Sequence, residues 1–212
     1  MKYRYAALFL LTVAVQCQAQ VHKCQNGVYT DRVCADGTTG GALKLPEAGT
    51  SSQMRFISHL ETYPVYGRTW QEVYAYMQKK GEFWAWARWT VNTEYTSRPT
   101  KGMCTLEDLK ITVDGKILMP EWQERSKATP ADRKAWDDSI ATLKIHEDGH
   151  IDHGKSAAIL LRQKLTGLGP QPCETLAKQA ADAKTKIEQT LSKSDEDYDR
   201  YTSHGLRQFN PS

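Results

Sequence analysis

The stretch HEDGHIDH, residues 146–153, places three histidines and three acidic residues in eight positions. His146 and His150 are four residues apart, a spacing that puts both imidazoles on one face of a helix, within reach of a single metal ion. Glu147 would then lie beside that ion and could deprotonate a water bound to it. Zn²⁺ suits this set, because it accepts imidazole nitrogen and lowers the pKa of bound water to about 7. We therefore predict a zinc site with Glu147 as general base.

A catalytic zinc ion usually takes a third ligand from the protein. His153 lies about 10.5 Å along the helix axis from His146, so one ion cannot easily take both as ligands. We expect His153 at the surface or in support of a ligand. His204 is the favoured third ligand, because the second long helix should return beside the first and Gly205 permits a sharp turn there. A loose chain end is the alternative for this segment.

The segment YDRYTSHG, residues 198–205, contains further candidates. Tyr198 or Tyr201 could donate a hydrogen bond to the oxyanion of a tetrahedral intermediate, although packing is the favoured role of either tyrosine. Asp199 could orient a ligand histidine, or could replace His204 as the third ligand.

Two long helices should position these residues. Thr129 and Pro130 provide an N-cap and a first-turn proline, and an apolar stripe that includes the motif continues to about Leu165. A second helix is predicted from Cys173 to about Ser192, running back antiparallel to the first. The metal-type residues therefore continue a buried stripe.

Upstream, the pattern predicts a short helix over 69–81, a strand over 83–96 and a further strand over 105–120 with a turn at Asp114-Gly115. The predicted fold class is α+β. We expect a small antiparallel sheet packed against two long antiparallel helices, the first of which carries the motif.

The N-terminus indicates export. Residues 1–19 contain two basic residues, an apolar run and a small residue at Ala19, as in a secretory signal peptide. The run is too short for a membrane span, and no later segment approaches about 18 apolar residues. Lipidation of Cys17 is disfavoured, because Gln16 precedes it. We predict a periplasmic or secreted protein with no membrane span.

Removal of the signal peptide leaves four cysteines, which in an exported chain imply two disulfides. Cys24 and Cys34 flank a tight turn and should form one bridge, which leaves Cys104 with Cys173. The predicted organisation of the mature chain is a small disulfide-bonded hairpin module, a linker rich in Gly, Ser and Thr, and one larger domain; these span residues 20–38, 39–58 and 59–212.

The chain resembles the bacterial family of predicted secreted zinc-dependent proteases in several motifs that occur in the same order. These are YPVYGRTWQEV (63–73), the Trp-rich strand (84–95), Cys104, LMPEW (118–122), HEDGH (146–150), Cys173 and YDRYTSHG (198–205). The resemblance implies that His146, Glu147 and His150 match the metal motif and that the C-terminal motif is matched by Tyr198, Asp199, Thr202, His204 and Gly205. His153 falls outside the family pattern, which supports leaving it out of the ligand set. The N-terminal hairpin is similar to a small module of exported bacterial proteins.

The favoured hypothesis is a zinc-dependent hydrolase, most simply a peptidase, acting on a peptide or protein in the cell envelope or medium. The alternative is a binding or structural module of the cell envelope that keeps its metal for stability. The formal net charge of +3 is spread along the chain, so nucleic-acid binding is not expected.

Overall fold

The computed structural model of the protein describes residues 22–23, 29–30, 52–81 and 84–205. Its elements in chain order are β1 (His22–Lys23), β2 (Tyr29–Thr30), β3 (Ser52–Val65), α1 (Trp70–Lys80), β4 (Trp86–Thr100), β5 (Met103–Trp122), the 3₁₀ turn Arg125–Lys127, α2 (Pro130–Thr166), β6 (Gln171–Pro172) and α3 (Cys173–Thr202). β1 and β2 pair antiparallel within the expected hairpin module. Cys24 and Cys34, the predicted bridge of that module, lie outside the described residues.

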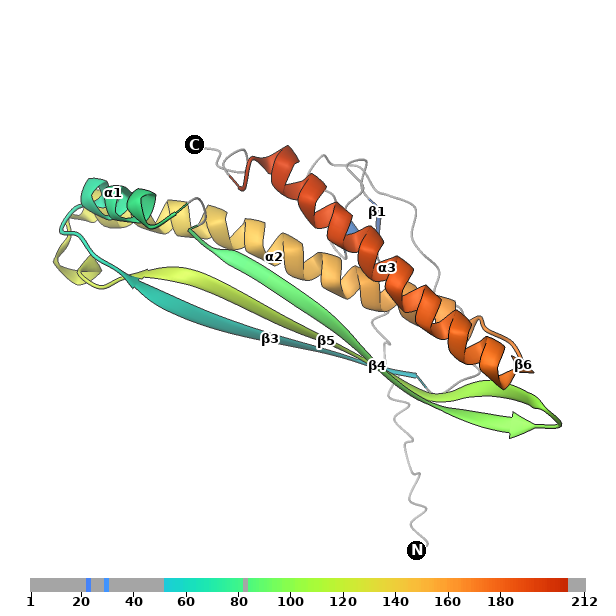
Figure 1. Ribbon diagram of the computed structural model, residues 1–212. Helices are drawn as coiled ribbons and strands as arrows, with labels where there is room; N and C mark the ends of the chain where they lie inside the picture. The colour runs from blue at the N-terminus through green and yellow to red at the C-terminus, as the bar shows by residue number, and fades with distance from the viewer. Residues whose placement is uncertain (1–21, 24–28, 31–51, 82–83, 206–212) are drawn as a thin grey trace, which may run out of the picture.

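The fold class is α+β, as predicted. β5 is the central strand of the main sheet, with β3 on one side and β4 on the other (Figure 1). β4 and β5 are antiparallel, whereas β3 is parallel to β5, so the sheet is mixed rather than wholly antiparallel. Two reversals of the chain, through α1 and at the turn Lys101–Gly102, separate β3 from β5 and leave them pointing the same way. β3 also begins at Ser52, inside the stretch expected to be a linker.

The predicted turn at Asp114-Gly115 is absent, and β5 continues through both residues. Gly115 pairs with Trp89 of β4 and with Ser58 of β3. A Cβ at this position would lie 2.9 Å from Ile151 Cδ1 of α2, closer than normal packing allows. The glycine therefore permits α2 to lie close to the sheet, and the tight turn lies instead at Lys101 and Gly102, where φ is positive at both residues.

Helix α2 begins as the sequence predicts. Thr129 caps it by accepting a hydrogen bond from the N–H of Asp132, and Pro130 occupies the first turn. The helix lies along one face of the sheet, and α3 packs against α2 from the same side (Figure 1). Apolar side chains of β5, α2 and α3 form the main core; among them are Ile111, Leu161 and Leu176.

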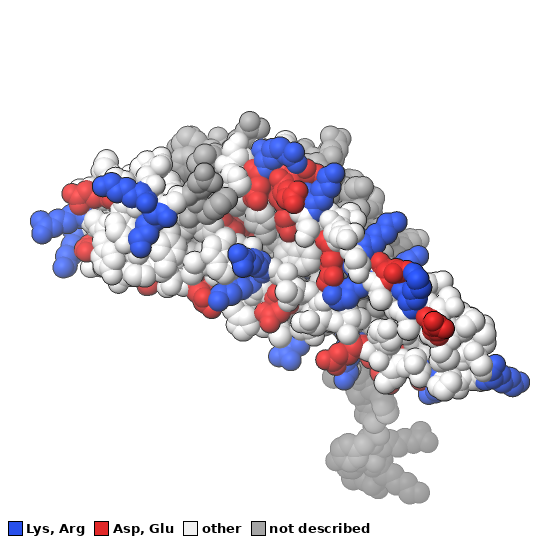
Figure 2. Space-filling view, viewed as in Figure 1, with Lys and Arg blue, Asp and Glu red and all other residues white. Residues whose placement is uncertain are grey.

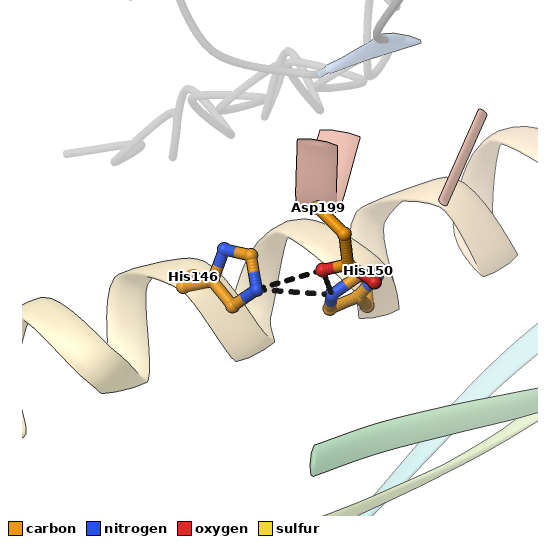
Figure 3. A group of neighbouring side chains, drawn as sticks. All are labelled: His146, His150 and Asp199. Carbon is orange, nitrogen blue, oxygen red and sulfur yellow. Dashed lines mark hydrogen bonds and ion pairs between the residues drawn. The ribbon is translucent and has the colours of Figure 1, made fainter. Parts of the chain in front are cut away.

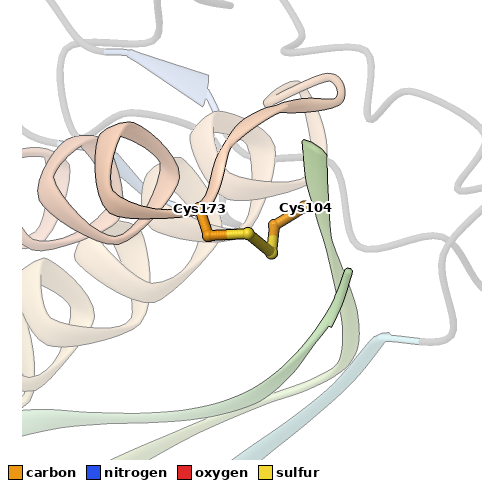
Figure 4. The surroundings of a disulfide bond; sticks show 2 residues. All are labelled: Cys104 and Cys173. Carbon is orange, nitrogen blue, oxygen red and sulfur yellow. A yellow bond between two sulfur atoms is a disulfide. The ribbon is translucent and has the colours of Figure 1, made fainter. Parts of the chain in front are cut away.

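Helix α3 extends to Thr202, ten residues beyond its predicted end at Ser192. Its start is anchored by the predicted disulfide between Cys104 of β5 and Cys173 (Figure 4). The segment expected to follow the helix is therefore largely its last turns. No helix in the described ranges is both long and apolar enough to cross a membrane.

Candidate metal centre

Two histidines of α2 and one aspartate of α3 place their ligand atoms close together. His146 Nε2 and His150 Nε2 lie 3.3 Å apart, and each lies 3.0 Å from Asp199 Oδ1 (Figure 3). Both histidines are buried, and Asp199 is partly exposed. The helical spacing of the histidines and the packing of α3 on α2 thus form a group of three residues that can hold a metal ion.

The hydrogen bonds of the two imidazoles indicate which ring nitrogen carries the proton. His150 Nδ1 lies 3.0 Å from Asp195 Oδ1, a carboxylate oxygen that accepts, so Nδ1 is the donor. Thr202 Oγ1 donates to a backbone carbonyl of its own helix and can therefore accept from His146 Nδ1 at 3.3 Å. With this assignment from the hydrogen-bond network, both Nε2 atoms direct a lone pair at the shared carboxylate oxygen.

The carboxylates around His150 favour positive charge on its imidazole. Burial acts to lower the pKa of His150, but the hydrogen bond and charge of Asp195, with Asp199 and Glu147 nearby, raise that pKa above its ordinary value. Added positive charge at Nε2, from a proton or from a metal ion, is therefore favoured in these surroundings. A metal ion would compete with the proton for the same nitrogen.

Glu147 is directed toward the sheet. Its carboxylate lies near the backbone N–H of Ala87 in β4, which acts to lower its pKa, and the residue is only 3% exposed. Burial raises the pKa of Glu147 to about 7; His150 opposes this shift, and Asp199 adds to it. A carboxylate with this pKa can take up and release a proton near neutral pH.

Tyr198 packs against the ligand histidines. Its ring stacks on the imidazole of His146 with centroids 4.9 Å apart and meets His150 edge-on at 5.3 Å. A Cβ at Gly149 would lie 2.5 Å from the Tyr198 hydroxyl, so this position of the motif must be glycine for the tyrosine to fit. Tyr198 therefore holds the imidazoles in place, the role that the sequence analysis favoured for it.

Tyr201 and His204 lie on the exposed side of the group. Tyr201 is 63% exposed, and the His204 side chain is 54% exposed. His204 follows Ser203, the C-cap residue of α3, and its Nδ1 lies 3.6 Å from Asp199 Oδ1. Asp199, the alternative third ligand, thus occupies the position between the two histidines, and His204 lies beside it.

His153 is completely buried, in contrast to the surface position that the sequence analysis allowed. Its Nδ1 lies 2.5 Å from Asp195 Oδ1, the same oxygen that contacts His150. The indole N–H of Trp89 in β4 donates to the other oxygen, Oδ2, at 2.8 Å. Burial acts to raise the pKa of Asp195, but the hydrogen bonds from His150 and His153 outweigh it and lower that pKa.

Acidic side chains gather over the C-terminal part of α3, beside the three potential ligands (Figure 2). They include the exposed Glu196 and Asp197 as well as the partly buried Asp195 and Asp199. Basic side chains lie beside them in the same view, and Arg200 pairs with Asp197.

The sequence model of the family described as "Bacterial protein of unknown function (DUF922)" matches residues 60–205. The chain belongs to this family. The match begins inside β3 and takes in residues 60–65 of that strand, the rest of the sheet, both long helices and every residue of the site described above. No curated protein and no solved structure matches the chain. Because the description of DUF922 gives no activity, the zinc-dependent protease expected from the sequence stays a proposal.

Sequence reasoning missed four contributors to this DUF922 site, namely Trp89, Asp195, Gly149 and Gly154. The glycines were a usable signal, since Gly149 and Gly154 lie inside a helix that otherwise favours larger residues. A Cβ at Gly154 would lie 2.7 Å from the Trp89 ring. Asp195 carried no such signal, because an aspartate near the end of an acidic helix resembles an ordinary surface residue.

Proposed function

We propose that the protein is an exported zinc-dependent hydrolase, most simply a peptidase, in which His146, His150 and Asp199 hold the metal and Glu147 is the general base. The observation that supports this proposal best is the convergence of three electron-pair donors in one buried place. Each pair is separated by 3.0–3.3 Å. A proton shared as a hydrogen bond or a metal ion held among them relieves the repulsion between such donors.

The spacing of the donors fits a zinc ion. With metal–ligand distances of about 2.0–2.1 Å, a tetrahedral zinc site separates its ligand atoms by about 3.3 Å. Two imidazoles and one carboxylate are a common zinc ligand set that leaves the fourth position open. Asp199 is partly exposed, so the group is not fully closed off from solvent.

When bound, zinc would polarise a substrate carbonyl and acidify water. Glu147 would take the proton from the attacking water and deliver it to the leaving amine. Its pKa of about 7 suits this exchange, and added positive charge nearby would lower it. Of the two candidate oxyanion donors, the exposed Tyr201 is better placed to meet a substrate than Tyr198, whose ring packs on His146.

An exposed strand edge supports a peptide as the substrate. β4 is an edge strand of the sheet, and no described strand pairs with its outer side. Ala87 of this strand lies near the Glu147 carboxylate, so β4 passes beside the proposed base. An extended peptide could add to β4 by main-chain hydrogen bonds and place a peptide bond there.

A metal that serves stability alone is the second candidate function, in a cell-envelope module without catalysis. It is favoured by the burial of His146 and His150. Structural zinc sites are almost always closed by four protein ligands, however, whereas this group contains three. The buried carboxylate of Glu147 beside a structural site would also have no role to offset the free-energy cost of its burial.

Export is part of the proposal. The Cys104–Cys173 disulfide is compatible with an oxidising compartment, as is the signal peptide predicted for residues 1–19. The substrate would then be a peptide or protein of the cell envelope or medium.

The test compares wild type with Glu147→Gln for bound zinc and for hydrolysis of a mixed peptide library. We expect both proteins to hold about one zinc ion per chain, and hydrolysis to fall at least about a hundred-fold in the variant. Glu188→Gln is the matched control, since this glutamate pairs with Lys184 on α3. Equal hydrolysis by wild type and Glu147→Gln, or none by a zinc-loaded wild type, would contradict the enzyme proposal.

A further inference from the structure

We propose that Asp195, held by His153 and Trp89, is a positioning residue that fixes the ring of His150 for metal binding. The inference rests on the proposed function, because it takes His150 as a metal ligand. It assigns a purpose to a buried cluster that the ligand set does not use.

Asp195 is the point at which three elements meet. It lies on α3 and accepts hydrogen bonds from His150 and His153 of α2 and from Trp89 of β4. The two imidazoles share Oδ1, and the indole takes Oδ2. Both carboxylate oxygens are therefore engaged by donors of fixed direction, and the carboxylate cannot rotate without losing one of them.

The contact determines the tautomer of His150. With Nδ1 as donor to Asp195, its Nε2 retains a lone pair and faces His146 Nε2 and Asp199 Oδ1. If the ring were flipped or held the other tautomer, Nε2 would be lost as a metal ligand. A carboxylate behind a ligand histidine is a known way to orient the ring and increase its basicity.

His153 and Trp89 in turn support Asp195. His153 is fully buried, and its Nδ1 makes the shortest contact of the cluster, 2.5 Å. Trp89 can approach only because residue 154 is glycine, since a Cβ there would lie 2.7 Å from the indole ring. The three contacts join the sheet and both helices directly behind the ligand histidine.

The same residues, His150, His153 and Asp195, also form a group that could hold a metal ion. Two observations favour a hydrogen-bonded cluster instead. His153 Nδ1 and Asp195 Oδ1 lie 2.5 Å apart, closer than two ligands of one ion, which lie about 3 Å apart or more. The remaining oxygen of Asp195 already accepts from the Trp89 indole.

The experiment measures zinc affinity by chelator competition in the full mature chain. Asp195→Asn should weaken zinc binding by about 10- to 100-fold, the range for residues that orient a ligand. An amide cannot accept from both His150 and the Trp89 indole, because one of its two ends is a donor. Asp152→Asn is the matched control, since this α2 carboxylate pairs with Lys155, and its affinity should equal that of wild type.

A pair of substitutions at His153 separates positioning from simple packing. His153→Asn keeps an N–H donor close to the place of Nδ1, and its zinc affinity should stay within about three-fold of wild type. His153→Leu fills a similar volume without a donor, and its zinc affinity should fall about ten-fold. This pair decides the question if Asp195→Asn does not fold. Equal affinities of the two variants would overturn the proposal.

Proton NMR of ¹⁵N-labelled protein gives a readout independent of zinc. The Nδ1 proton of His150 should give a downfield, slowly exchanging signal in wild type that disappears in Asp195→Asn and remains in Asp152→Asn. A wild type without zinc affinity would contradict the proposed function while leaving this signal as the test of positioning. Wild-type zinc affinity in Asp195→Asn, or an unchanged signal, would overturn the inference.

Discussion

At the scale of residues, two glycines give the motif its shape. Gly149 and Gly154 remove the side chains that would keep Tyr198 and Trp89 away from α2. Through these gaps one aromatic ring reaches the ligand imidazoles, and the other reaches Asp195. Glycine has a lower helical propensity than other residues, but at these two positions it permits the close approach of the aromatic rings.

Replacing Gly149 by alanine tests the first gap. The new methyl group would lie 2.5 Å from the Tyr198 hydroxyl, so the ring must move, and we expect a loss of about 1–3 kcal/mol in the free energy of unfolding despite the better helical propensity of alanine. Gly169→Ala is the control, because nothing lies within 4 Å of a Cβ there. Urea denaturation measures both, and equal stabilities would show that Tyr198 is not confined by Gly149.

A second residue-scale prediction concerns Glu147 and pH. In the folded protein burial raises its pKa to about 7 from an ordinary value of 4.5. Between these values the folded state binds the proton and the unfolded state releases it, so folding becomes less favourable as pH rises. In the metal-free protein, ionisation of Glu147 should therefore lower the free energy of unfolding by up to about 3 kcal/mol at pH 7 and above.

Glu147→Gln removes the titrating group and keeps the shape of the side chain. The unfolding free energy of metal-free wild type, measured against that of the variant, should therefore fall between pH 4.5 and pH 7. Parallel pH profiles of the two proteins would show that Glu147 titrates normally.

At the scale of elements, helix α3 is anchored at one end and forms the site at the other. Cys173 begins the helix in a disulfide with Cys104, and Asp199 lies about 39 Å further along its axis. The bridge closes a loop of 69 residues in sequence separation. Such a bridge stabilises mainly by restricting the unfolded chain.

Removing the bridge should therefore lower stability and leave the site intact. We expect Cys104→Ser with Cys173→Ser to cost about 2–4 kcal/mol in urea unfolding. Zinc affinity at 25 °C should change less than about three-fold, because packing on α2 still places Asp199. A loss of affinity as large as that of His146→Ala would mean that the bridge itself positions the site.

The sequence predicted some elements well and others poorly, for physical reasons. The start of α2 was predictable because Thr129 and Pro130 are local signals of a helix N-terminus. The end of α3 was not, because its inner stripe continues after Leu191 in residues that face the site and are partly polar, namely Asp195, Tyr198 and Thr202. The parallel pairing of β3 depends on contacts distant in sequence, which local patterns do not contain.

The site was predictable to a similar extent. The four-residue spacing of His146 and His150 is a helical property, and it indicated their convergence without knowledge of the fold. The position of Asp199 between them depends on the register of α3 against α2. If α3 ended at residue 192, either His204 or Asp199 could follow it to the two histidines. The sequence therefore left the choice of third ligand open.

At the scale of the whole molecule, α2 lies between the sheet and α3 and directs site residues toward each of them. Its His146 and His150 face α3, where Asp199 completes the group, whereas Glu147 faces β4. The proposed metal therefore lies where the two helices meet, and the proposed base lies where α2 meets an edge strand. Metal binding would stabilise the docking of α3 and thereby the whole domain.

The most direct test of this account is anomalous diffraction at the zinc absorption edge from crystals of the mature protein grown with zinc. The account predicts one strong peak within about 2.0–2.2 Å of His146 Nε2, His150 Nε2 and an Asp199 oxygen, with His204 beside it and the Asp195–His153 contact retained. A peak bound by His150, His153 and Asp195, or no peak near α2, would contradict it.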